Sequence, residues 1–297
     1  MTATTSQTIL LTGASTGFGN LTAQRLLHDG HHVIASMRDP EGRNLAPATQ
    51  LEELAKTTPG SVTVLDIDVT DSESIDKGVK AALAAAGPID VLVNNAGQAF
   101  LGPFEAFSDA QLRAQFEVNF FGAASMIRAV MPGMRESGKG LFVNLSSGLG
   151  RAVFPGTGVY SASKFAMEAM SEAIRYEASA FGVDSVTVEP GAHATPIVSR
   201  FVEPEDKVAA SAYGPIGNTV GNWQGSLGEF FESGGGNPND VVEAIVSLIE
   251  ADPSKRPARV AVGQDVAFVQ ELNKVALAPQ IDGLKTFGME DFTHLVR

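Results

Sequence analysis

An aromatic hydroxyl and an ammonium group stand four residues apart in the segment Tyr160-Ser161-Ala162-Ser163-Lys164. On a helix this spacing places both side chains on one face, about one turn apart. A tyrosine with the ordinary pKa of about 10 is a poor acid or base near neutral pH, but a nearby cation stabilises the phenolate and lowers that pKa. We therefore interpret Tyr160 and Lys164 as a proton-transfer pair, although a tyrosine and a lysine on a helix surface would show the same spacing.

Two more polar residues could take part in the same chemistry. Ser147 follows the apolar run 141–145, which is typical of a strand, and ligands of open α/β sheets bind beyond the carboxyl ends of strands. Asn119 stands in an otherwise apolar helical stretch, where it is either a surface residue or a buried amide that needs partners, such as a water chain to Lys164. The candidate catalytic residues are therefore Asn119, Ser147, Tyr160 and Lys164.

A glycine-rich turn follows the first apolar run, in Thr12-Gly13-Ala14-Ser15-Thr16-Gly17-Phe18-Gly19. Glycines allow a tight turn and a close backbone approach, and the helix that follows points unpaired N–H groups at a pyrophosphate. The pattern predicts a dinucleotide-binding turn that comprises Gly13, Ser15, Gly17, Phe18 and Gly19. The same letters also match the G-x-S-x-G turn of serine hydrolases, in which Ser15 would be the nucleophile. Gly19 has no role in that turn, and no earlier strand could supply an oxyanion hole.

The end of the second apolar run indicates which dinucleotide is bound. An acidic residue about 20 positions beyond the glycines would hold a ribose 2′-hydroxyl, but this sequence has Met37 followed by Arg38. A guanidinium group suits a 2′-phosphate, so we predict NADP(H) rather than NAD(H). Asp39 could neutralise Arg38, and this possibility stays open from the sequence.

Short apolar runs alternate with helix-length segments along the chain. Several runs are apolar almost throughout, as expected for strands that are covered on both faces of a parallel sheet. Strand–helix alternation of this kind predicts a doubly wound α/β fold, with a seven-stranded parallel sheet and helices on both faces. The seven predicted strands are residues 8–12, 32–36, 62–66, 91–94, 141–145, 185–189 and 259–262.

Helix ends and irregular segments complete this picture. Thr70 with Glu73, and Ser108 with Gln111, each fit a capping box, and Gly182 fits a helix end. Residues 196–238 are rich in glycine, proline, asparagine and aromatic residues, and we expect a long loop that covers the substrate. Residues 264–297 would form a C-terminal extension, helical around 267–276. We expect residues 1–297 to form a single Rossmann-type domain.

Composition excludes several classes of protein. The chain has 297 residues, 34 of them acidic and 21 basic, and no cysteine. The formal charge of −13 argues against nucleic acid and anionic lipid as partners. The absence of cysteine excludes disulfides and thiolate chemistry. The histidines near Gly30 (His28, His31 and His32) read as surface residues, so we expect no metal. Without an apolar run of membrane-spanning length or a signal peptide, we expect a cytoplasmic protein.

Taken together, these motifs resemble those of the short-chain dehydrogenase/reductase family in its single-domain form. The resemblance covers residues 8–262, and each motif alone is weaker evidence than their common order and spacing. The matching residues are Thr12-Gly13-x-x-x-Gly17-x-Gly19, Asp68-Val69, Asn94-Asn95-Ala96-Gly97, Asn119, Ser147, Tyr160-x-x-x-Lys164 and Pro190-Gly191 followed by Thr195.

The resemblance implies a role for each matching residue. Tyr160 would exchange the proton with the substrate oxygen, and Lys164 would bind the nicotinamide ribose and lower the pKa of Tyr160. Ser147 would polarise the carbonyl group, and Asn119 would anchor a proton-relay water. The other implied contacts are with adenine (Asp68, Val69), the adenosine ribose (Asn95, Ala96, Gly97) and the nicotinamide end (Pro190, Gly191, Thr195).

The predicted function is hydride transfer between NADP(H) and a ketone or secondary alcohol. Leu149, Val153, Phe154 and the aromatic residues of 196–238 suggest a bulky apolar substrate in a pocket walled by residues 98–104, 148–155 and 196–238. We regard His193 as a passive neighbour of this pocket. Two alternatives stay open, a cofactor-sensing regulator without turnover and, less favoured, the serine hydrolase. A homodimer through the helices of Asn119 and Tyr160 is possible.

Overall fold

The structure is a computed structural model that describes residues 6–289 and 291, and its centre is one seven-stranded parallel sheet. The strand order is β3-β2-β1-β4-β5-β6-β7, so the chain winds outward from β1 in one direction and then outward from β4 in the other. This confirms the predicted doubly wound fold. The strands are β1 (Thr8–Thr12), β2 (His32–Met37), β3 (Ser61–Asp66), β4 (Val91–Asn94), β5 (Gly140–Leu145), β6 (Val183–Pro190) and β7 (Arg259–Val262).

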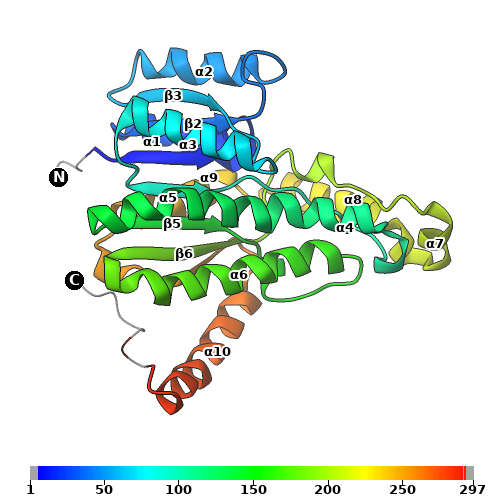
Figure 1. Ribbon diagram of the computed structural model, residues 1–297. Coiled ribbons are helices and arrows are strands. Elements are labelled where there is room, and N and C mark those ends of the chain that lie inside the picture. Colours follow the sequence, from blue (N-terminus) through cyan, green and yellow to red (C-terminus); the bar gives the residue numbers. More distant parts are fainter. Residues whose placement is uncertain (1–5, 290, 292–297) are drawn as a thin grey trace.

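Helices cover both faces of the sheet (Figure 1). The first face carries α1 (Gly17–His28), α2 (Leu45–Ala55) and α9 (Pro238–Glu250). The second face carries α3 (Ser72–Ala86), α5 (Ala123–Ser137) and α6 (Gly158–Ala178). The short helix α4 (Asp109–Phe116) leads into α5 through a π-helical turn, η2 (Glu117–Gly122). Short 3-10 turns are η1 (Phe104–Ala106), η3 (Gly148–Gly150), η4 (Ser179–Phe181) and η7 (Pro253–Lys255).

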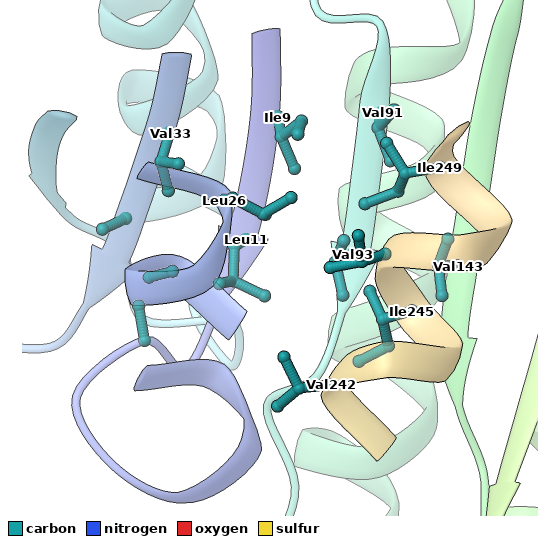
Figure 2. Close-up of a cluster of buried hydrophobic side chains, with 14 of the residues drawn as sticks. Ile9, Leu11, Leu26, Val33, Val91, Val93, Val143, Val242, Ile245 and Ile249 are labelled. Carbon is teal, nitrogen blue, oxygen red and sulfur yellow. The ribbon is translucent and has the colours of Figure 1, made fainter. Parts of the chain in front are cut away.

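The alternation of side chains along each strand explains why the central strands are mostly apolar. Ile9 and Leu11 on β1 pack with α1 and α9 on the first face, as Figure 2 shows for this cluster. Leu10, between them, packs with α3 and α5 on the second face. All three side chains are fully buried. Because both faces are covered, a central strand buries mainly apolar side chains, and a polar one needs a partner, as Asn94 has in Asn144 at 2.9 Å.

Two of the three predicted helix ends are confirmed. Ser108 and Gln111 form a capping box at the start of α4, and Gly182, at φ 70°, ends the turn that follows α6. The box predicted for Thr70 and Glu73 is wrong, because Asp71 caps α3 and accepts the Glu73 N–H at 2.9 Å. The Thr70 hydroxyl instead donates to Asp68 at 2.8 Å.

Residues 196–238, here called the cover segment, are mostly helical, whereas a loop was expected. They contain η5 (Val198–Arg200), α7 (Lys207–Ala212), η6 (Gly214–Asn218) and α8 (Thr219–Glu232). The segment lies at the carboxyl ends of the strands, at the right of Figure 1. Val202 anchors it by a parallel bridge to Phe100, after β4. The final helix α10 (Ala267–Thr286) is longer than predicted and projects from the sheet (Figure 1).

Candidate active site

A cavity of about 1120 Å³ runs from the glycine-rich turn to the cover segment, along the carboxyl edge of the sheet. It brings together most of the residues singled out from the sequence. Those that line it are Gly13, Ser15, Gly17, Phe18, Arg38, Asp68, Val69, Asn95, Ala96, Gly97, Ser147, Tyr160, Lys164, Pro190, Gly191 and Thr195. Gly19 and Asn119 do not line the cavity. They contact residues that do, Asn95 and Gln98 respectively.

The glycine-rich turn is built around positions where only glycine fits. Gly13 and Gly17 have φ angles of 69° and 58°, in the left-handed region that side chains disfavour. A Cβ atom on Gly19 would lie 2.4 Å from both the Asn95 amide nitrogen and the Gly13 carbonyl oxygen. Asn95 occupies that space because its amide donates to the Thr12 carbonyl oxygen at 2.8 Å. Asn95 therefore holds the turn rather than only flanking it.

The amino end of α1 opens toward the cavity with its backbone donors unpaired by side chains. Its N-cap residue, Thr16, makes no side-chain capping hydrogen bond, and the first turn holds no acidic residue. A helix start of this kind attracts an anion through its N–H groups and dipole. Arg200, from the cover segment, also reaches this point and donates to the Thr16 hydroxyl at 3.5 Å. Two positive groups therefore face one part of the cavity, which fits a pyrophosphate.

The end of the cavity beyond β2 has two arginines, Arg38 and Arg43, rather than one. The Arg38 guanidinium is half exposed, and its nearest acid is Asp68 at 3.9 Å. Asp39, which the sequence left as a possible neutralising partner, instead accepts the Arg43 backbone N–H at 2.9 Å. Arg43 and Asn44 also line the cavity, and sequence reasoning missed both. The signal was present, because Arg43 lies five residues beyond Arg38 in the same loop.

Tyr160 and Lys164 lie in the first two turns of α6, and both side chains are buried. The Lys164 Nζ donates to the Leu145 carbonyl oxygen at 2.7 Å and lies 5.8 Å from the centre of the Tyr160 ring. Ser147, at the end of β5, is the N-cap of η3 and also hydrogen-bonds the Tyr160 hydroxyl. The structure thus places the three side chains at one point of the cavity wall.

Burial dominates the pKa values of the Tyr160–Lys164 pair. It raises the pKa of Tyr160 to about 12, against a smaller lowering by the Ser147 hydrogen bond. It lowers the pKa of Lys164 to about 8, against a smaller raising by the charge of Glu168. The lowering of the Tyr160 pKa by Lys164 stays a prediction, because in the chain without cofactor burial has the larger effect and raises that pKa. The desolvation cost of a buried phenolate outweighs a cation at this distance.

Asn119 is fully buried, so its interpretation as a surface residue is wrong. The π-helical turn η2 directs its amide at the loop after β4, where it accepts the Gln98 N–H at 2.9 Å and donates to the Gln98 carbonyl oxygen at 3.0 Å. It also donates to the Ser163 hydroxyl at 3.0 Å. Its partners are protein groups, and the predicted water relay stays a prediction.

Two glutamines that the sequence analysis missed extend this role of Asn119. Gln115, one turn earlier, accepts the Phe100 N–H at 2.8 Å and donates to the Gln98 carbonyl oxygen at 2.9 Å. Gln111, another turn earlier, donates to Glu203 of the cover segment at 2.9 Å. The sequence signal for these residues is the spacing of four between the side-chain amides at 111, 115 and 119. The three amides fix the cavity wall to α4 and η2.

The far end of the cavity is apolar and aromatic. Leu149, Phe154, Phe201, Trp223 and Phe268 line it, from η3, the loop after it, the cover segment and α10. Val153, predicted to face the substrate, is 59% exposed and does not line the cavity, so that prediction is wrong.

The histidines at 31 and 193 are both buried, far apart in the sequence. His193 is buried on the cavity wall, with Nδ1 3.1 Å from the Gly191 carbonyl oxygen. His31, expected on the surface, is also buried. Within residues 6–289 and 291, no three histidine, cysteine, aspartate or glutamate residues are grouped so as to hold a metal ion.

Comparison with known proteins agrees with this site. The model of the short chain dehydrogenase family matches residues 7–206. The 3-ketodihydrosphingosine reductase of Bacteroides thetaiotaomicron is 40% identical over 62% of this chain, which spans 63% of that relative, less than two thirds of its length. Human retinol dehydrogenase 8 is 35% identical over 82% of this chain and 78% of its own.

A solved structure extends the likeness over nearly the whole chain. A short-chain dehydrogenase from Streptomyces avermitilis is 32% identical, with a TM-score of 0.75 over 96% of this chain and 97% of that one. The fold and the cavity define an oxidoreductase that binds a nicotinamide dinucleotide. This chain belongs to the short-chain dehydrogenase/reductase family. No helix in the described part of the chain has the length and hydropathy to span a membrane.

Proposed function

We propose that this protein transfers a hydride between NADP(H) and a ketone or secondary alcohol, with Tyr160 as the general acid or base. One observation carries the proposal. The buried Tyr160 and Lys164 and the half-buried Ser147 meet on the wall of a single cavity that begins at the glycine-rich turn. A cofactor laid along that cavity from the turn has its reactive end at this group of side chains.

Each catalytic side chain has a task that its position supports. The bound cofactor supplies or accepts the hydride. In the direction of reduction, Tyr160 donates its proton to the oxygen of the substrate carbonyl, and Ser147 donates a hydrogen bond to the same oxygen. Lys164, held by the Leu145 carbonyl, contributes a fixed positive charge that stabilises the phenolate left on Tyr160. Asn119 positions the Gln98 backbone beside them.

The residues present fit a dinucleotide. Gly13 and Gly19 clear a close backbone approach at the turn, and the unpaired start of α1 suits a pyrophosphate. Arg200 would add a cation to that pyrophosphate from the cover segment. Arg38 and Arg43 at the adenosine end favour a 2′-phosphate, because β2 ends in Met37 without an acid that would hold a ribose 2′-hydroxyl.

The apolar far end of the cavity favours a bulky apolar substrate. The ring centre of Phe154 lies 6.4 Å from that of Trp223 and 5.8 Å from that of Phe268. Apolar lining with few polar groups selects substrates by size and shape. The cover segment would close this end, which supports its proposed role over the substrate.

No observation favours either alternative function. Ser15 lies in the glycine-rich turn, and His193, the histidine that lines the cavity in the described part of the chain, places Nδ1 against the Gly191 carbonyl oxygen. A sensor without turnover would not need Ser147, Tyr160 and Lys164 together. A homodimer through the helices of Asn119 and Tyr160 would use two exposed side chains, Phe121 of η2 and Phe165 of α6.

The variant Tyr160→Phe tests the proposal because it removes one hydroxyl from a buried ring. We expect turnover with NADPH on a panel of apolar ketones to fall at least 100-fold, the scale of a lost acid–base group. NADPH affinity, measured by quenching of the fluorescence of Trp223, should stay within about threefold, because the ring still fills its place. A correctly folded variant that keeps near-normal turnover would contradict the role of Tyr160.

A further inference from the structure

A buried cluster of charged side chains lies one helical turn beyond Lys164. Glu168, four residues further along α6, is 2% exposed and accepts a hydrogen bond from the Arg259 Nε of β7 at 3.0 Å. Its other oxygen is buried without a hydrogen-bond partner. Gly150 makes room for this carboxylate, since a Cβ atom there would lie 3.4 Å from that oxygen and 2.4 Å from the Ser146 hydroxyl.

The cluster carries more negative than positive charge. Glu172 of α6 accepts a hydrogen bond from Arg259 at 2.6 Å. Glu189 of β6 lies 3.8 Å from Arg259 and 3.9 Å from Arg151. Burial and the charge of Glu168 raise the pKa of Glu189 to about 7. Burial also raises the pKa of Glu168, and the charges of Arg259 and Arg151 oppose that shift. When all three carboxyl groups are ionised, three carboxylates face two guanidinium groups, and one negative charge is left over.

Lys164 is the buried cation next to this excess charge. Its ammonium donates to a neutral group, the Leu145 carbonyl oxygen, at 2.7 Å and lies 5.8 Å from the centre of the neutral Tyr160 ring. Within the described residues, no carboxylate lies within 4 Å of its Nζ. Burial lowers the pKa of Lys164, and the charge of Glu168 opposes that shift. Lys164 and Glu168 stand four residues apart on α6, so they share a helix face.

We propose that Glu168 is a positioning residue, the buried counter-charge that keeps the Lys164 ammonium protonated at the pH of catalysis. Its effect is transmitted through space along one face of α6, and Arg259 fixes the carboxylate in place. The inference rests on the proposed function for the use that catalysis makes of Lys164, but the charge coupling itself belongs to the chain without cofactor. Glu168 itself does not line the cavity.

The direct test is a titration of the lysine side-chain nitrogens by NMR in the cofactor-free protein, with Lys164→Met to assign the resonance. In the unmodified chain we expect a Lys164 midpoint near pH 8. In Glu168→Gln the midpoint should fall by about one pH unit, the usual effect of losing one opposite charge at short range. Glu168→Asp, which keeps the charge, should restore most of the shift.

Glu172→Gln is the matched control. It also removes a carboxylate partner of Arg259, but Glu172 lies a second turn away from Lys164. We expect its Lys164 midpoint to match that of the unmodified chain. Equal midpoints in Glu168→Gln and the unmodified chain, or equal shifts in both glutamine variants, would overturn the proposal. This result does not depend on the outcome for Tyr160→Phe, so the two proposals fail separately.

The rate of ketone reduction gives a second measurement. If Lys164 must be protonated, a midpoint lower by about one unit reduces kcat/KM about fivefold at pH 8 and leaves it nearly unchanged at pH 6. A merely structural role would lower kcat/KM equally at both pH values and would contradict the proposal. If Glu168→Gln does not fold, a titration of the unmodified chain still tests the coupling between Glu168 and Lys164. Its Glu168 carboxyl carbon resonance should shift with the Lys164 midpoint, and an insensitive resonance refutes the coupling.

Discussion

At the scale of single residues, the cost of burying charge controls what the site can do. Tyr160 and Lys164 are both buried, and their pKa values move in opposite directions, one to about 12 and the other to about 8. Burial thus stabilises the neutral phenol and moves its pKa away from neutral pH, so the proposed acid–base role of Tyr160 needs the charge of Lys164 to oppose that shift. Burial lowers the pKa of Lys164 toward neutral pH, and the charge of Glu168 opposes that shift.

The two arginines at the adenosine end give the first prediction at this scale. Arg38→Glu should lower the ratio of kcat/KM for NADPH to that for NADH by tenfold or more, because a charge-assisted hydrogen bond contributes about 1.5–3 kcal/mol. Arg43→Glu should change the ratio in the same direction. Arg128→Glu, an exposed residue of α5 outside the cavity, is the control. An unchanged ratio in both variants would argue against NADP(H) as the preferred cofactor.

Residues with a chemical signature in the sequence could be found in advance, and residues that only position others could not. Tyr160, Lys164 and Ser147 were identified from type and spacing, and the structure places them together. Gln111, Gln115 and Glu168 were missed because a buried amide or carboxylate looks like a surface one in a helical stretch. Their meaning depends on which backbone or charge faces them, and only the packed structure supplies that information.

At the scale of elements, the turn between β1 and α1 offers a sharp test of packing. Gly19→Ala would place a methyl group 2.4 Å from the Gly13 carbonyl oxygen, which is backbone and cannot move away cheaply. We expect a loss of about 1–3 kcal/mol in unfolding free energy, as for an overpacked core, and at least tenfold weaker NADPH binding. Urea denaturation and fluorescence titration measure the two effects.

Gly133→Ala in α5 is the matched control for that substitution. A Cβ atom at Gly133 would meet nothing within 4 Å. Because alanine favours a helix over glycine, this variant should gain about 0.5–1 kcal/mol and bind NADPH normally. If Gly19→Ala behaved like Gly133→Ala, the turn would have to be far more adaptable than its geometry indicates.

The strands were predictable because burial on both faces of the sheet is the main requirement on their residues. Each predicted strand lies within an observed one, since a strand covered on both faces buries mainly apolar side chains and stands out as an apolar run. The cover segment was expected as a loop because of its glycines and asparagines, yet it forms α7 and α8. Packing of Val220 and Trp223 against Leu101 and Leu149 stabilises α8, so tertiary contacts override weak helix propensity there.

At the scale of the whole molecule, the charged cluster joins α6, β6, β7 and α10 and makes stability depend on pH. Glu189 has a pKa near 7 when folded and an ordinary value of about 4.5 when unfolded. Between these values the folded chain binds more protons, so the unfolding free energy falls as pH rises toward 7. Asn273 of α10 donates to the same carboxylate at 2.6 Å, so α10 shares this dependence.

Glu189→Gln tests this dependence, because glutamine keeps the shape and the acceptor for Asn273 without the charge. We expect the variant to exceed the unmodified chain by about 2–3 kcal/mol in unfolding free energy at pH 8, and to match it near pH 4.5. Urea denaturation at the two pH values measures both. The same difference at both pH values would show that packing, rather than ionisation, separates the two proteins.

The π-helical turn η2 ties the catalytic wall to the core in a way that a single missing residue would reveal. A π turn holds one residue more than an α-helical turn, because its hydrogen bonds run from i to i+5. Removing one amino acid from Glu117–Gly122 would therefore give a regular helix in which Met126, Val130 and Met134 keep their buried face. The wide turn that directs the Asn119 amide at Gln98 would be lost. A relative with a one-residue gap at this point should keep the core of the sheet and lose this support of the cavity wall.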